Sequence, residues 1–88
     1  MDFNTVWQKI ILNEGNTFTT VTGKVFSYTI SGTLLHPVIG EKEIRNISKT
    51  NIEKAFLEWP VSKPSSFSSS IQGTSYLFAL FTDKRIME

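Results

Sequence analysis

His36 is the only histidine in the 88-residue chain and the first side chain to consider for catalysis or metal binding. A zinc site or an acid–base pair needs further ligands, or a partner that orients the imidazole. The chain has no cysteine, so neither a thiolate zinc set nor a disulfide can form. His36 precedes Pro37 on an expected strand, and we interpret it as an exposed or capping side chain.

Glu41 and Glu43 are the closest the chain comes to a pair of catalytic carboxylates. Acid–base chemistry requires that one carboxyl group be desolvated, so that its pKa is shifted. Lys42 lies between the two glutamates and Arg45 follows them, with no apolar flank on either side. This pattern indicates a solvated, charged turn.

The serines of residues 65–70 lack the G-x-S-x-G pattern of a nucleophile elbow, and the chain contains neither a Walker A nor a G-x-G-x-x-G motif. We interpret the serine cluster as a spacer. Because the chain offers no set of acid, base, nucleophile and metal ligand, the sequence predicts a non-enzymatic protein without a cofactor.

Positive side chains are the stronger candidate for a binding site. The set comprises Lys24, Lys42, Arg45, Lys49 and Lys54. Lys24 is expected at a hairpin tip, and the others surround the start of an expected helix. A helix N-terminus with nearby cations suits a phosphate group. The set therefore predicts weak, sequence-independent contacts with the DNA or RNA backbone, although the net charge is only +1.

The alternative partner is another protein, with the domain acting as an inhibitor or assembly adaptor. Eleven aromatic residues are many for 88 residues. Trp59 and Phe67 lie near loop boundaries, where an exposed ring would form a binding patch. Phe67 stands alone among polar neighbours, as an anchor for a partner or as an internal pin. The predicted edge strand, Thr33 to Val38, could also accept a partner strand.

The first element expected is an amphipathic helix. Its apolar residues recur at helical spacing, at Phe3, Val6, Trp7, Ile10 and Ile11. Asp2 or Asn4 is the expected N-cap, and Gly15 follows the end of the helix.

Three strands follow, at Thr17 to Thr22, Val25 to Ile30 and Thr33 to Val38, separated by Gly23-Lys24 and Ser31-Gly32. Two-residue loops would place Thr22 opposite Val25 and Ile30 opposite Thr33. The core face would then carry Val21, Phe26, Tyr28, Ile30 and Leu35. The opposite, mostly polar face would carry Phe18, Thr20, Thr22, Val25, Ser27, Thr29, Leu34 and His36. Pro37 is expected on an edge strand, because proline cannot donate to a ladder.

The rest of the chain is expected to be helical, with intervening loops. Residues 40–46 form a charged loop, and Ser48 or Thr50 caps a helix, with Thr50-x-x-Glu53 as a capping box. Ile52, Ala55, Phe56 and Trp59 make its core-facing stripe, and Pro60 ends it. After a loop over residues 61–70, residues 76–82 form either a helix or a buried strand. We favour the helix, because alanine and leucine are good helix formers.

The order of one helix, three strands and a second helix opened by Ser48-Lys49 resembles the topology of double-stranded-RNA-binding domains. That family places several lysines in the first turns of the second helix, where this chain has Thr50, Asn51 and Ile52. It also carries a histidine in the first hairpin loop, which here is Gly23-Lys24. The resemblance is therefore one of topology.

These observations predict a single small domain, residues 1–88, of the α+β class. A three-stranded antiparallel meander packs against helices carrying Trp7, Ile11, Phe56 and Leu77, in the order α-β-β-β-α-α. With 40% apolar and 19% charged residues, the chain is expected to fold. No signal-peptide pattern and no apolar run near the roughly 20 residues of a membrane span are present, so no membrane contact and a cytoplasmic location are expected.

Overall fold

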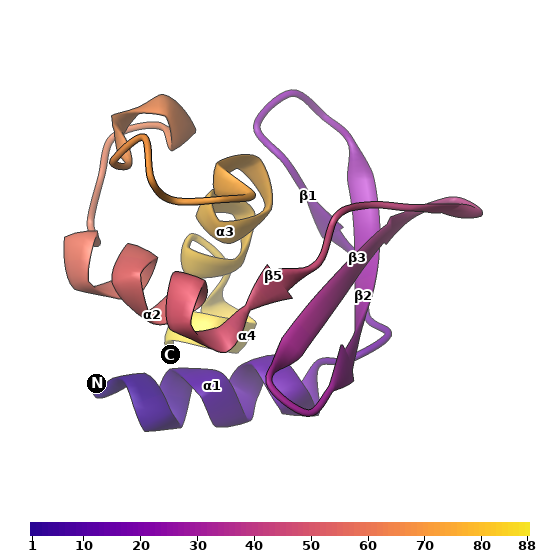
Figure 1. Ribbon diagram of the computed structural model, residues 1–88, viewed down its shortest axis with the longest axis horizontal. Helices are drawn as coiled ribbons and strands as arrows, with labels where there is room; N and C mark the ends of the chain where they lie inside the picture. Colours follow the sequence, from indigo (N-terminus) through magenta and orange to yellow (C-terminus); the bar gives the residue numbers. More distant parts are fainter.

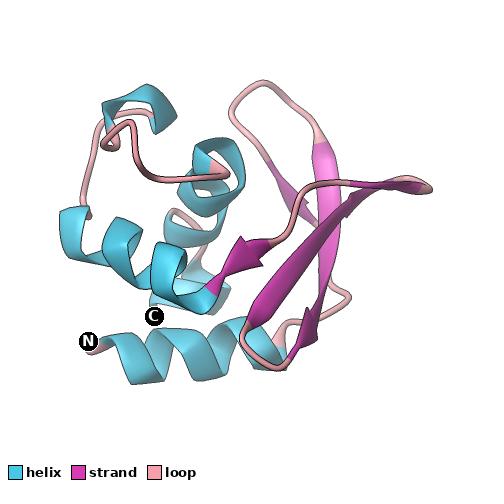
Figure 2. Cartoon of the chain, viewed as in Figure 1, coloured by secondary structure: helices cyan, strands magenta, loops and turns pink.

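The computed structural model describes the whole chain, residues 1–88, as an α+β fold of two layers. Helices lie on one side of a twisted antiparallel sheet, and its other side is uncovered (Figures 1 and 2). Strand order is β1-β2-β3-β4, and β5 also pairs with β3. The elements are α1 (Phe3–Leu12), β1 (Phe18–Thr19), β2 (Val25–Ser31), β3 (Leu34–Ile39), β4 (Lys42–Glu43), β5 (Ile47–Ser48), α2 (Lys49–Glu58), a 3₁₀ turn (Pro64–Ser66), α3 (Thr74–Phe81) and α4 (Lys84–Met87). The predicted class and the helix-first order are confirmed, but the sheet has five strands where three were expected.

Helix α1 begins as predicted. The Asp2 carboxylate accepts a hydrogen bond from the Thr5 N–H at 2.8 Å, which satisfies one of the free amides of the first turn. Four apolar side chains are buried, at Phe3, Val6, Trp7 and Ile10. Ile11 was expected in the core as well, but it is 36% exposed, because it lies at the margin of the buried side of the helix.

The β1–β2 hairpin differs from the prediction. Thr19 pairs with Val25, so the connection spans residues 20–24 and is not the two-residue Gly23-Lys24 loop. Thr20 closes it, because its N–H donates to the Lys24 carbonyl and its hydroxyl accepts from the Lys24 N–H. An odd shift in register exchanges the faces of a strand. Phe18 is consequently buried, and Val21 is 64% exposed.

The β2–β3 hairpin preserves the predicted faces. Ser31 pairs with Leu34, so the loop is Gly32-Thr33, one residue later than expected. Gly32 has a φ of 60° and Thr33 a negative φ, as a type II′ turn requires. Phe26, Tyr28 and Leu35 therefore form the core face, as predicted.

Strand β3 lies inside the sheet, so its prediction as an edge strand is wrong. The expected loop 40–46 contains β4, and both β4 and β5 pair with β3 on the side away from β2. The Pro37 carbonyl accepts from the Ile44 N–H, so the backbone of Pro37 points toward the β4 side. Its missing N–H therefore costs no hydrogen bond between β2 and β3.

Helix α2 is capped by Ser48, whose hydroxyl accepts from the Asn51 N–H at 3.1 Å. The expected capping box of Thr50 and Glu53 is wrong, because Thr50 already lies inside the helix. Ile52 and Ala55 are buried, and the helix ends before Trp59-Pro60, as predicted.

The C-terminal segment completes the core with helices. Residues 74–81 form α3, which confirms the helix over the buried strand, and Leu77, Leu80 and Phe81 are buried. Gly73 precedes α3 with a φ of 68°, and a side chain there would meet Ile47. Helix α4 was not predicted, because a four-residue helix gives too short a periodic pattern.

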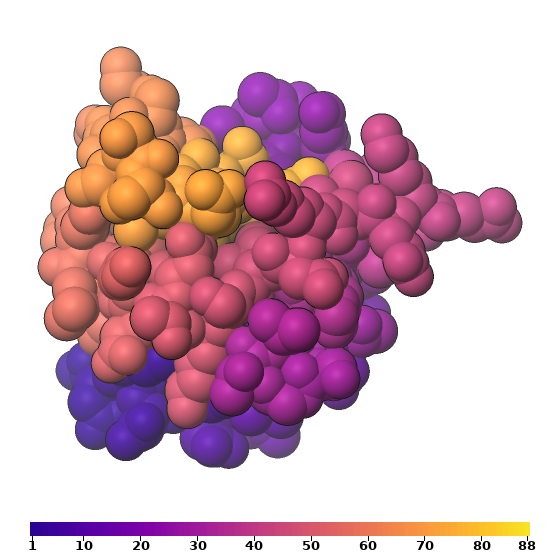
Figure 3. Space-filling model, in the orientation of Figure 1, coloured from indigo at the N-terminus to yellow at the C-terminus, as the bar shows by residue number.

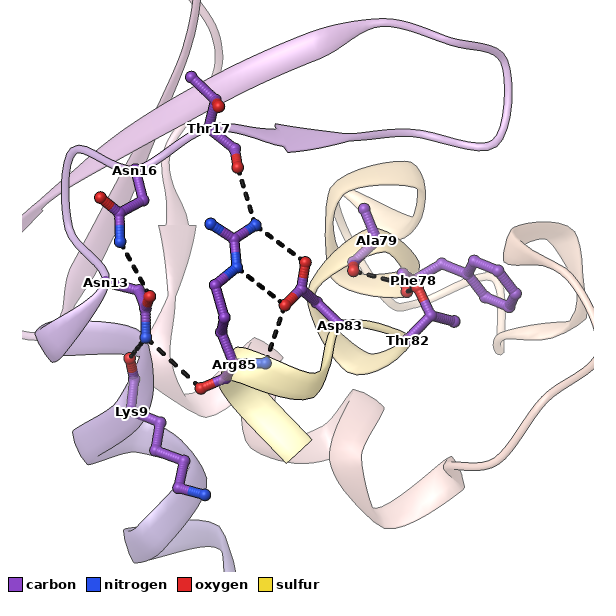
Figure 4. A network of polar contacts seen from close by, with 9 residues as sticks. All are labelled: Lys9, Asn13, Asn16, Thr17, Phe78, Ala79, Thr82, Asp83 and Arg85. Atoms are coloured by element: carbon purple, nitrogen blue, oxygen red, sulfur yellow. Dashed lines mark hydrogen bonds and ion pairs between the residues drawn. The ribbon is translucent and has the colours of Figure 1, made fainter. Parts of the chain in front are cut away.

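A polar network fastens α4 to β1 and to the end of α1 (Figure 4). The Arg85 guanidinium donates to Asp83 and, at 2.9 Å, to the Thr17 carbonyl. It also lies 4.1 Å from the centroid of the Phe18 ring. Asn13 donates to the Arg85 carbonyl. The hydrogen bonds from Arg85 hold the pKa of Asp83 below its usual range.

Tyr28 joins the sheet to α1 at the centre of the core. Its hydroxyl donates to the Ile10 carbonyl at 2.6 Å, and the side chain is fully buried. Burial raises the pKa of Tyr28 far above its ordinary value, because the phenolate would lose its hydration.

Candidate functional site

The five predicted phosphate-binding cations do not converge. Lys24 ends the β1–β2 loop, Lys49 and Lys54 lie on α2, and Lys42 and Arg45 lie on residues 40–46, which we call the arm. In Figure 1 the β1–β2 loop projects at the top of the view, the arm extends to the right, and α2 lies within the helical layer on the left. The structure therefore brings only Lys42 and Arg45 together on one projection.

The start of α2 is occupied by contacts within the chain. The Lys49 N–H donates to the Thr33 carbonyl at 2.8 Å, and the Asn51 N–H donates to Ser48. These are two of the amides that a phosphate at a helix start would use. The Lys49 ammonium lies 5.4 Å from the centroid of the Trp7 ring, in an internal cation–π contact.

The arm stands clear of the body in the space-filling view (Figure 3). It carries Lys42 and Arg45, but also Glu41 and Glu43, all of them exposed. The arm is consequently a polar projection with no net charge.

His36 is half-buried on β3 and its Nδ1 is hydrogen-bonded to the Asn46 side chain, which ties the end of the arm to the sheet. No acidic group orients the imidazole, and no group of three or more potential metal ligands surrounds it. His36 is thus half-buried and bonded to a side chain of the arm, neither fully exposed nor bonded to the end of a helix.

Phe67 and Trp59, predicted as interface residues, pack on each other. Their ring centroids are 6.3 Å apart, and Phe67 is only 5% exposed. Trp59 also contacts Phe78 and Phe81. Phe67 thus lies in the position of the internal pin, one of the two roles left open by the sequence.

The loop around Phe67 is fastened from outside as well. The Ser68 N–H and hydroxyl both donate to the Glu58 carboxylate. The Ser68 hydroxyl bond lowers the pKa of Glu58. Asn51 makes two hydrogen bonds with the backbone of Gln72 farther along the chain. The chain is thereby held against α2 at Ser68 and again at Gln72.

A different surface emerges on the uncovered side of the sheet. We call it the outer sheet face, and it is formed by Val25, Ser27, Thr29 and Ser31 of β2 and Leu34, His36 and Val38 of β3. The register places Ser27 beside Val38, Thr29 beside His36 and Ser31 beside Leu34. With His36 neutral, none of these side chains is charged. The aliphatic side chains of Val25 and Leu34 are 54% and 38% exposed.

The edges of the long strands are not available to a partner. Where β1 does not cover it, the edge of β2 is closed by the segment that follows α1, since the Gly15 N–H donates to the Tyr28 carbonyl and the Ile30 N–H to the Glu14 carboxylate. Strand β3 is paired on both sides. The strand addition expected at residues 33–38 therefore has no free edge.

The residue alternation places most of the outer sheet face on one side of the sheet, but by itself it does not mark that side as a site. The signal was present in residues 25–31, where every second residue is a small aliphatic or hydroxyl side chain. Other exposed apolar residues, such as Leu12 and Leu57, lie on separate helices. Scattered residues of this kind are usual on protein surfaces.

Comparison with models of protein families, with curated proteins and with solved structures found no match for this chain. None of its helices combines the length and the hydropathy needed to cross a bilayer.

Proposed function

We propose that this chain is a non-enzymatic protein-binding domain whose contact surface is the outer sheet face. The supporting observation is the lack of acidic and basic side chains on this face, in a chain with nine basic and eight acidic residues. The centres of protein interfaces are depleted of charged residues, whereas their rims are polar. Lys24 and Glu43, next to Val25 and Val38, provide such a rim.

The composition of the face supports contact over mere solvation. Natural sheets use charged side chains, lysine above all, to oppose association of exposed strands. Here the outward positions of β2 are Val25, Ser27, Thr29 and Ser31. Aliphatic side chains gain from burial against a partner, and hydroxyl groups lose little when they exchange water for a partner's polar groups.

Site-specific photo-crosslinking tests this proposal. A photo-reactive amino acid would replace Thr29 on the outer sheet face, and in a matched control it would replace Gln8, which is exposed on α1. In cells that make the protein, the Thr29 probe is expected to form protein adducts that the Gln8 probe does not. Identical adduct patterns at the two positions would contradict the proposal.

A nucleic-acid role is the second proposal; its support is that Lys42 and Arg45 share the projecting arm, although Glu41 and Glu43 balance their charge. Any binding would be weak and strongly salt-dependent. Fluorescence anisotropy with duplex and single-stranded oligonucleotides at about 50 mM salt tests it. Lys42→Glu with Arg45→Glu should lower the affinity more than Lys49→Glu, because Lys49 is engaged with Trp7. Absence of binding by the wild type would remove this proposal.

A further inference from the structure

We draw no further inference here: the strongest candidate, the outer sheet face of β2 and β3, is an unpartnered and mostly polar surface, and nothing in the structure shows what covers it.

Discussion

The two faces of strand β2 differ although their residues alternate along one segment. Phe26 and Tyr28 point inward and are almost fully buried, whereas Val25 and Thr29 point outward and are exposed. The inward residues pack against the helical layer, and Tyr28 donates to the backbone of α1. Outward residues have no helix over them (Figure 2). The inward face supplies the core, and the outward face is the proposed contact surface, so substitutions on each face should have separable effects.

The largest effect is expected on the inward face. Phe26→Ala should lower the free energy of unfolding by about 3–5 kcal/mol, because it leaves a cavity beside Phe18 and Tyr76. Chemical denaturation followed by circular dichroism measures the change. If the Phe26→Ala variant unfolded at the same denaturant concentration as the wild type, the inward face of β2 would not contribute to the core.

Phe67 extends the comparison to the loop of residues 61–70. Phe67→Ala should lower the free energy of unfolding by more than about 1 kcal/mol, because the ring is buried against Trp59. Ser69→Ala, an exposed position of the same loop, is the control and should leave stability unchanged. Equal stability of the Phe67→Ala and wild-type proteins would refute the internal pin.

A smaller effect is expected from the polar fastening of α4. Arg85 lowers the pKa of Asp83 in the folded protein, so the stabilisation is present above the unfolded pKa of about 3.9. It is lost as pH falls through the lower folded value. Because the pair is partly exposed, its contribution is at most about 1 kcal/mol.

Asp83→Asn keeps a good helix cap but removes the charge. Its stability should therefore decrease less steeply than that of the wild type when unfolding is measured from pH 5 to about pH 2. Parallel curves for the two proteins would show that the ion pair contributes nothing.

Sequence reasoning succeeded where one periodic pattern extends over a whole element. The stripe of α1 and the alternation of β2 each involve several apolar residues, and the structure has both elements. It failed where a single residue decides. Burial of Phe18 over Val21 changed the register of the first hairpin by an odd number of residues. Local residue propensities do not predict this register, because it depends on how Phe18 packs against the helices.

The candidate site shows the same division. Strands of two residues, such as β4 and β5, have no pattern of their own, so β3 was mistaken for an edge. Lys42, Arg45, Lys49 and Lys54 are near one another in sequence, which suggested a single site. In the structure the first two lie on the arm and the last two on α2. Conversely, the outer sheet face becomes visible only when the pairing of β2 with β3 brings its residues together.

The central claim is that the outer sheet face serves contact and contributes little to folding, and the stability of Thr29→Lys tests it most directly. Thr29 is exposed, although the preceding residue, Tyr28, is buried. Its partner on β3, His36, lies between the buried residues Leu35 and Pro37. The unfolding free energy of Thr29→Lys, measured by denaturation at low protein concentration, should lie within about 0.5 kcal/mol of the wild type. A loss comparable to that of Phe26→Ala would contradict the account, because the outer face would then belong to the fold.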